Sequence, residues 1–327
     1  MLPVAVDAMG GDNAPDAIVT GAKRAVEERG IPVVLVGRPE ELGDTGGIEV
    51  IAASEVIAMD DDPGSSVRTM KDSSLVRAAE AVRDGVASSM VSAGNTGATM
   101  ASALLRTGRI KGVSRPAIAT AIPGPSGPPT VMLDSGANAE CKPEWLVQFA
   151  QMGAVFARTR FDIDTPRVGL LSIGEEAGKG SPFVKESWGL LDAVDWSAQG
   201  AEFIGNVEGR DLMGDEVDVV VTDGFTGNVA LKTLEGCAQN IMGALLEAFD
   251  SSDEARAASA QLMPALLPLY QRFSADTYGG AMLLGTKGVC IISHGSSNDE
   301  AMLNAISVAS EMVNSDLVGR IGEAVNA

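Results

Sequence analysis

The stretch VDVVVTDGFTGNVALKTLEG, residues 217–236, passes from a run of valines through a turn rich in Gly and Thr into a helical pattern. An apolar run this continuous is typical of a strand buried on both faces, and such strands belong to parallel sheets covered by helices. Gly224 and Gly227 allow a sharp turn between the two elements. The stretch therefore predicts a strand, a tight loop and a helix, the unit from which α/β proteins are built.

The same alternation continues along the 327 residues. Further β-rich runs predict strands at residues 3–8, 32–37, 88–94, 116–123, 130–136, 167–174, 202–207 and 288–295. Apolar stripes predict helices at residues 14–30, 74–85, 143–160, 226–249 and 298–321. We therefore expect an α/β fold with a mainly parallel sheet and helices on both faces, as a single domain over residues 1–327 with room for two lobes.

Composition narrows the class of protein. The start of the chain, MLPVAVDAMGGD, lacks the basic region of a signal peptide, so we expect a cytoplasmic protein. The three cysteines, Cys141, Cys237 and Cys290, are far apart and odd in number, which argues against disulfides and against a zinc site. The net charge of −20 argues against nucleic-acid binding, because affinity for the phosphate backbone comes from Lys and Arg.

One stretch lacks this acidic character. Residues 85–133 contain no Asp or Glu, although basic side chains gather there at Arg106, Arg109, Lys111 and Arg115. Two interpretations are open: a surface kept for an anionic partner, or a basic loop that is merely solvated.

Residues 251–280 form an apolar segment without an evident partner. Five large apolar side chains lie within residues 262–269, around Pro264 and Pro268, which are expected to break or kink a helix. The apolar surface needs cover from the same subunit, from a second subunit or from a membrane surface.

The loops after the predicted strands hold small and polar residues. In SAGNTGA, residues 92–98, glycines let the backbone approach a ligand, while Ser92, Asn95 and Thr96 offer polar side chains before a predicted helix. Such a loop is either an anion site or a capped turn. The phosphate-loop pattern GxxxxGK[ST] is absent and the pattern GxGxxG is not found in position, so a nucleotide site is not indicated.

Three further side chains are candidates for chemistry. Asn228 can either cap a helix or donate its amide to a carbonyl oxygen. Lys179, between two glycines in IGEEAGKGSP (residues 173–182), is either a solvated cation or a charge stabiliser on a loop. His294, the only histidine of the chain, is either structural or part of a site.

No activated nucleophile of the protein's own is indicated, because no GxSxG elbow, Ser-His-Asp order or cluster of metal ligands occurs. Inorganic phosphate needs no such activation, since it is already an oxyanion at neutral pH, and a thioester has a good leaving group. A protein that joins the two has to hold phosphate, orient the acyl carbonyl and stabilise the developing oxyanion. Glycine-rich loops, Asn and Thr donors and one or two cations are adequate for that task.

Taken together, the motifs resemble those of the PlsX-type phosphate acyltransferases. The matching stretches run in order along the whole chain: VAVDAMGGDNAP, SAGNTGA, GRIKG, LDSGAN, KPEWLVQFAQMG, RVGLLSIGEE, FIGNVEGRDL, DVVVTDGFTGNVALKTLEG, YGGAMLLGTKG and HGSS. The resemblance implies transfer of a fatty acyl group from acyl-acyl carrier protein to inorganic phosphate, which gives acyl phosphate for phospholipid synthesis. It also implies a fold like that of isopropylmalate dehydrogenase and phosphate acetyltransferase, a homodimer, no metal or cofactor, and peripheral contact with the cytoplasmic membrane.

The matching positions imply roles for individual residues. Lys179 and Asn228 are expected at the reacting centre. The residues expected to line the substrate and phosphate pocket are Asp7, Gly10, Gly11, Asp12, Ser92, Asn95, Thr96, Asn138 and His294. The residues expected to dock the acidic carrier protein are Arg106, Arg109, Lys111 and Arg115. Residues 251–280 are expected to serve a dimer or membrane contact.

Two positions depart from the family pattern. Asn13 stands where many members have His, so any role of that imidazole is missing here. Ser181 stands where Asn is common, which changes the surroundings of Lys179.

Two other functions fit parts of the same sequence. One is a short-chain phosphotransacetylase that uses coenzyme A, and the other is a non-catalytic scaffold that binds carrier protein and membrane. The intact loops around Lys179 and Asn228 favour an enzyme over a scaffold. A metal-dependent dehydrogenase of the same architecture is not supported, because only Tyr270 and Tyr278 are present for its acid–base pair.

Overall fold

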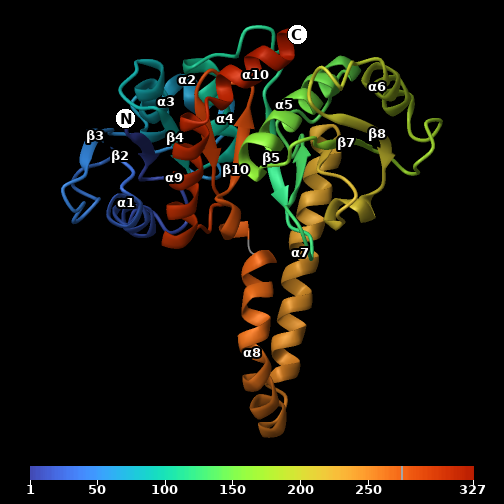
Figure 1. Cartoon of the computed structure of the whole chain (residues 1–327). Coiled ribbons are helices and arrows are strands. Elements are labelled where there is room, and N and C mark those ends of the chain that lie inside the picture. Colours follow the sequence, from blue (N-terminus) through green and yellow to red (C-terminus); the bar gives the residue numbers. More distant parts are fainter. Residues whose placement is uncertain (274) are drawn as a thin grey trace.

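The computed structural model describes residues 1–273 and 275–327. Figure 1 shows a body with helices on both sides of a sheet, from which a long helical hairpin extends. The hairpin consists of α7 (Gly224–Phe249) and α8 (Asp253–Phe273). The predicted α/β fold, with a mainly parallel sheet and helices on both faces, is confirmed.

Within the described residues the sheet has eleven strands, in the order β3, β2, β1, β4, β11, β10, β5, β6, β9, β7, β8. The strands are β1 (Val4–Asp7), β2 (Val33–Gly37), β3 (Glu49–Ala52), β4 (Ser89–Ser92), β5 (Ala117–Ile122), β6 (Thr130–Leu133), β7 (Arg167–Leu171), β8 (Glu202–Val207), β9 (Val219–Val221), β10 (Ala281–Leu284) and β11 (Val289–Ile292). Each predicted strand is present. The strands β3 and β10 are additional: β3 is a partly exposed edge strand without a continuous apolar run, and β10 is only four residues long.

The direction of the strands changes in the middle of the sheet. Neighbouring strands are parallel except in three pairs, β11 with β10, β10 with β5, and β5 with β6. The carboxyl ends of β1, β4 and β11 therefore lie at one edge of the sheet, and those of β6, β9, β7 and β8 lie at the opposite edge. Because ligands of α/β sheets bind beyond the carboxyl ends of strands, each edge is a place for site residues.

Helices cover both faces of the sheet, and the sheet separates the two main hydrophobic cores. On one face lie α1 (Asp16–Arg29), α5 (Pro143–Phe161), α6 (Pro182–Asp192), α9 (Asp299–Asn314) and α10 (Leu317–Asn326). On the other face lie α2 (Pro63–Thr69), α3 (Ser74–Arg83), α4 (Thr96–Arg106) and the first turns of α7, with the short helix η1 (Gly209–Met213) beside them. Successive strand residues enter different cores, Val4 and Val6 one and Ala5 the other, which explains why the strands are continuously apolar.

The prediction of one helix over residues 298–321 is wrong. The chain forms α9 and α10 instead, because Asp316 between them takes a left-handed conformation with a φ of 51°. A non-glycine residue in that region ends a helix and redirects the chain. The helices α2 and α6 were not predicted either; each begins with a proline after a capping residue, Asp62 and Ser181 respectively.

The hairpin differs from the prediction in a second way. The helix α8 continues through Pro264 and Pro268, so of the predicted break or kink the break is wrong and the kink stays a prediction. Both prolines are exposed, so the carbonyl groups that lose a helical partner face water. No described residue of α8 is buried, and large apolar side chains are exposed on both helices: Ile241, Leu246, Leu262, Met263, Leu267 and Leu269. The body of the same subunit therefore does not cover this surface, and residue 274 of the predicted segment lies outside the described residues.

Candidate active site

The predicted site residues fall into two sets, one at each edge of the sheet. The first set follows β1, β4 and β11, which are adjacent and parallel. The second set follows β6, β9 and β7, which are also adjacent and parallel. Each set has its own network of hydrogen bonds.

In the first set, Asp7 joins the loops after β1 and β4. Its carboxylate is buried and accepts a hydrogen bond of 2.7 Å from Ser92 Oγ, which in turn accepts one of 3.0 Å from the backbone N–H of Gly94. A Cβ on Gly10 would lie 2.6 Å from Asp7 Oδ2, so this position requires glycine. Burial raises the pKa of the Asp7 carboxyl, and hydrogen bonds from Ser74, Ser92 and Met9 oppose that rise. Asp7, Ser92 and Gly10 thus hold the two loops together.

The loop after β1 also meets the loop after β11. The N–H of Asp12 donates to the carbonyl oxygen of Gly295 at 2.7 Å. The Asn13 side chain donates to the carbonyl oxygens of Ser296 and Ser297 at 3.1 and 3.2 Å. Asn13 therefore fastens the loop that carries His294. The His294 ring is exposed, with Nδ1 2.7 Å from Ser296 Oγ.

Both polar groups of the Asn95 side chain make hydrogen bonds to the backbone. Its Oδ1 accepts a hydrogen bond of 3.0 Å from the N–H of Ala98, which confirms that it caps α4. Its Nδ2 donates to the carbonyl oxygens of Met59 and Asp61 at 2.9 and 3.1 Å. The neighbouring Thr96 is exposed at the start of α4.

The second set is built around Asp134, a residue that was not predicted. It follows β6 directly, is fully buried, and accepts hydrogen bonds from the N–H groups of Ala137 and Asn138 at 2.9 and 2.7 Å. Burial raises the pKa of the Asp134 carboxyl, while the hydrogen bonds it accepts oppose the rise. The signal in the sequence was an acid directly after an apolar strand and before a Gly/Asn turn.

Asn138 connects this turn to two other segments. Its Nδ2 donates to the carbonyl oxygen of Pro116 at 2.9 Å and to Asp134 Oδ2 at 2.8 Å. Its own carbonyl oxygen accepts a hydrogen bond of 2.8 Å from the N–H of Gly224, the first residue of α7. Asn138 therefore positions the start of α7 rather than presenting its amide to a ligand.

The start of α7 is capped without the Asn228 side chain. The helix cap is Asp223, which accepts hydrogen bonds from the N–H and the hydroxyl of Thr226 at 2.9 and 2.8 Å, so the alternative of a cap by Asn228 is wrong. The Asn228 side chain is exposed and lies over Gly136, where a Cβ would be 3.4 Å from its Oδ1. Within the described residues it makes no hydrogen bond, so its amide is free to meet a ligand.

Lys179 lies on a loop whose conformation is held by hydrogen bonds to the carbonyl oxygen of Glu176. The carbonyl oxygen of Glu176 accepts hydrogen bonds from the N–H of Lys179 at 2.9 Å and from Asn206 Nδ2 at 2.8 Å. Asn206 is 5% exposed in β8 and was not predicted as a site residue; its signal was a polar side chain inside an apolar strand. The Lys179 side chain is half exposed, and its Nζ lies 4.0 Å from Glu176 Oε2.

Lys179 and Asn228 follow two adjacent parallel strands, β7 and β9 respectively. Leu170 of β7 pairs with Val221 of β9, so the loop that carries Lys179 and the start of α7, which carries Asn228, lie at the same edge of the sheet. A cation and an amide donor, both accessible there, can act on an anionic oxygen. The catalytic roles of these two residues stay predictions.

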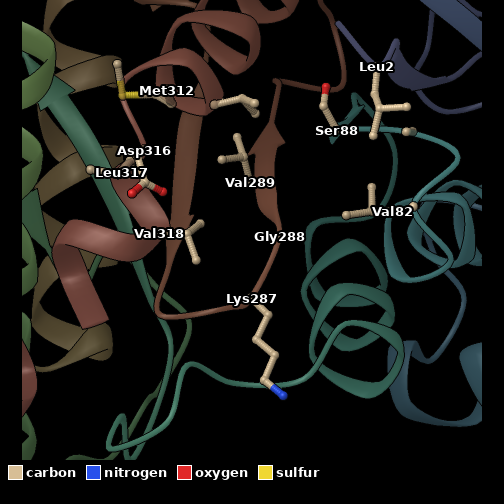
Figure 2. Close-up of a pocket in the computed structure, with 13 residues that line it drawn as sticks. Leu2, Val82, Ser88, Lys287, Gly288, Val289, Met312, Asp316, Leu317 and Val318 are labelled. Carbon is tan, nitrogen blue, oxygen red and sulfur yellow. The ribbon is translucent and has the colours of Figure 1, made fainter. Parts of the chain in front are cut away.

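The basic stretch lies on the loop between α4 and β5. Arg109, Lys111 and Arg115 are exposed, while Arg106, the last residue of α4, lies against Glu80. A surface pocket of about 440 Å³ lies nearby (Figure 2). The thirteen residues that line it are mostly apolar, include Lys287 and Asp316, and include none of the residues predicted for catalysis.

Residues 1–273 and 275–327 offer neither a metal site nor a membrane-spanning helix. In that part of the chain, no three His, Cys, Asp or Glu side chains are grouped so that they can hold a metal ion. None of its helices combines the length and the apolar character that crossing a membrane requires.

Comparison with known proteins identifies the family. The model of a family described as fatty acid synthesis protein matches residues 2–320. The phosphate acyltransferase of Leptospira biflexa serovar Patoc is 46% identical over 330 residues, covering 98% of this chain and 96% of that protein. The phosphate acyltransferase of Desulforudis audaxviator is 45% identical over 322 residues, covering 97% and 94%.

The fold has relatives among solved structures as well. EutD phosphotransacetylase from Staphylococcus aureus has a TM-score of 0.62 and 15% identity, over 95% of this chain and 94% of that one, which shows a shared fold. The family match and the nearly full-length relatives confirm the resemblance read from the motifs. The chain therefore belongs to the fatty acid synthesis protein family and groups with its phosphate acyltransferases.

Proposed function

We propose that the chain is an enzyme that transfers a long-chain fatty acyl group from acyl-acyl carrier protein to inorganic phosphate, giving an acyl phosphate for phospholipid synthesis. The observation that supports this most is the pair Lys179 and Asn228, a cation and an uncommitted amide that leave the same edge of two adjacent parallel strands. The names of the relatives, phosphate acyltransferases, support the same reaction.

In the proposed reaction, an oxygen of hydrogen phosphate attacks the carbonyl carbon of the thioester and forms a C–O bond, while the C=O electron pair moves to oxygen. The carbonyl then reforms, the C–S bond breaks, and its electron pair leaves with sulfur. The proton of hydrogen phosphate balances the one that the free thiol gains. Because a thiol is far more acidic than an alcohol, the thiolate leaves without an acid catalyst.

Each of the two residues has a separate task in this scheme. The Lys179 ammonium offsets the negative charge of phosphate as it approaches the carbonyl, and the Asn228 amide donates to the oxyanion that develops. Phe225 and Val229, which are 66% and 49% exposed, flank Asn228 with apolar surface that suits an acyl chain.

The first set of residues supports substrate binding in this proposal. Because this set lies at the opposite edge of the sheet from Lys179 and Asn228, its exposed side chains, Asp12, Thr96 and His294, are assigned to a part of the substrate remote from the reacting carbonyl. The glycines at positions 10 and 11 bring the backbone close, and the buried pair Asp7 and Ser92 keeps the loops in place.

The hairpin is proposed to serve a homodimer and peripheral contact with the cytoplasmic membrane, because its apolar side chains have no cover from their own subunit. Leu267→Glu should weaken self-association or binding to vesicles, because it places a charge on an apolar surface. Sedimentation velocity and co-sedimentation with vesicles of phosphatidylglycerol and phosphatidylethanolamine measure the two. Gln261→Glu adds the same charge at an exposed polar position of α8 and is the matched control. Unchanged behaviour of Leu267→Glu in both assays would remove both roles.

The acyl donor that the protein accepts distinguishes the proposed function from its two alternatives. Purified protein is mixed with phosphate and either long-chain acyl-acyl carrier protein or acetyl-coenzyme A, and free thiol is measured. The proposal expects release from the long-chain donor. Release from acetyl-coenzyme A alone would indicate a short-chain phosphotransacetylase, and release from neither would indicate a binding scaffold.

A further inference from the structure

The basic stretch contains one residue that serves the protein's own packing. Arg106 is 21% exposed, its Nε lies 3.7 Å from Glu80 Oε1, and its Nη2 donates to the carbonyl oxygen of Val67 at 3.3 Å. Its guanidinium thus connects α4 to α2 and α3. Arg106 is therefore engaged mainly within its own subunit.

The other three cations of the stretch face solvent. The Arg109 guanidinium donates to the carbonyl oxygen of Ser114, and the Arg115 guanidinium lies 5.1 Å from the centre of the Trp145 ring. Within the described residues, Arg109, Lys111 and Arg115 have no carboxylate within ion-pair distance. Other exposed cations, such as Arg29 and Lys71, also lack an ion pair among the described residues, so the feature that distinguishes this stretch is that residues 85–133 contain no Asp or Glu in a chain of net charge −20.

A fourth cation, far away in the sequence, joins them. The N–H of Lys287 donates to the carbonyl oxygen of Gly108 at 2.9 Å, and the N–H of Ile110 donates to that of Gly285 at 3.0 Å. The turn between β10 and β11 is thereby attached to the basic loop. The Lys287 side chain is exposed, also lacks an ion pair within the described part of the chain, and lies at the rim of the pocket in Figure 2.

This surface is connected to the candidate reacting centre. Arg115 precedes Pro116, whose carbonyl oxygen accepts the 2.9 Å hydrogen bond from Asn138 Nδ2. The carbonyl oxygen of Asn138 in turn accepts from Gly224 at the start of α7, four residues before Asn228. A protein docked on the four cations is therefore beside the edge of the sheet where Asn228 and Lys179 lie.

We infer that Arg109, Lys111, Arg115 and Lys287 form one docking surface for an acidic protein, with Lys287 taking the place assigned to Arg106 from the sequence. The partner is the acidic carrier protein, so this inference rests on the proposed function. The complementary charges are the argument: an acidic protein keeps four cations together without acidic partners, next to the reacting groups. Such a surface speeds association with an acidic partner and lowers its KM, while chemistry at the thioester is unaffected.

The test compares two donors that share the same thioester. Lys287→Glu should raise KM for long-chain acyl-acyl carrier protein at low salt by about fivefold or more and leave kcat unchanged. It should leave both constants for the corresponding acyl-pantetheine unchanged, because that donor has no protein body. The effect should shrink as salt screens the charges, since the Debye length falls from about 30 Å at 0.01 M to about 10 Å at 0.1 M.

Controls separate charge from folding. Lys287→Arg keeps the charge and should behave like the wild-type protein. Arg29→Glu reverses a charge on an exposed residue of α1 outside this surface and should leave KM unchanged. Arg106→Gln should lower thermal stability without a selective rise of KM for the carrier protein.

A direct binding assay tests the docking surface without relying on turnover. Fluorescence anisotropy of labelled carrier protein should show weaker binding to Lys287→Glu than to the wild-type protein at low salt. Equal affinities would overturn the docking surface even if the enzyme is active. A wild-type protein that binds carrier protein in this salt-dependent way but forms no acyl phosphate would overturn the proposed function and leave the surface supported.

Discussion

Asn228→Ala and Lys179→Ala are each expected to lower kcat for acyl phosphate formation by about 10²–10³-fold, the range measured when one donor to an oxyanion is removed from an enzyme. The expectation follows from the accessible amide of Asn228 and the half-exposed side chain of Lys179. Because neither side chain holds the fold together, both variants should unfold at the same urea concentration as the wild-type protein. Initial rates of thiol release at saturating donor and phosphate give kcat.

Two comparisons sharpen this expectation. Lys232→Ala removes a lysine of α7 that pairs with Glu235 at 2.8 Å on the surface, and it should keep nearly full turnover. Asn206→Ala should lose less kcat than Lys179→Ala, because it releases the loop through Glu176 but leaves the ammonium in place. Folded Asn228→Ala and Lys179→Ala proteins with wild-type turnover would contradict both role assignments.

Gly227→Ala is expected to have the largest effect on stability, about 2–3 kcal/mol of unfolding free energy, together with loss of turnover. A Cβ at Gly227 would lie 2.0 Å from the carbonyl oxygen of Asp134, so the start of α7 has to move away from the turn after β6. That movement displaces Asn228, which follows directly in the chain. Urea denaturation and initial rates measure the two consequences.

The same helix provides the control for this substitution. Gly236→Ala introduces the same methyl group where nothing lies within 4 Å of the new Cβ, and it should raise stability by about 0.5–1 kcal/mol because alanine favours a helix over glycine. If Gly227→Ala were as stable as Gly236→Ala, the close contact between α7 and the Asp134 turn would be wrong.

The fold could be predicted from the sequence where one element carries its own signal. The valine run of β9 and the Gly/Thr turn after it defined a buried strand and a helix without help from the rest of the chain. The break at Asp316 could not be predicted, since it depends on a left-handed conformation that aspartate adopts rarely. The unbroken α8 could not be predicted either, because the rule against internal proline does not consider that both rings face solvent.

The site was predicted in part for a similar reason. Lys179 lies on a loop and Asn228 lies in the first turns of α7, and both stretches have a composition that is unusual by itself, so the sequence alone indicated these two residues. Asn206 and Lys287 act through backbone groups that are 30 and 179 residues away in the chain, Glu176 and Gly108, and such pairings arise only when the sheet forms. Asn95 and Asn138 looked like ligand contacts because the same amide that binds a ligand also satisfies a buried carbonyl group.

Phosphate dependence of acyl transfer is the most direct test of the central claim. Long-chain acyl-acyl carrier protein is incubated with the wild-type protein, with and without inorganic phosphate, and free thiol is measured. Hydroxylamine, which also cleaves thioesters, is added only after the carrier protein has been removed, so that it traps acyl phosphate alone. The account predicts thiol release only with phosphate, and an equal amount of acyl hydroxamate formed from acyl phosphate. Thiol release of equal rate without phosphate, with free fatty acid as the product, would show that water is the nucleophile and would contradict the account.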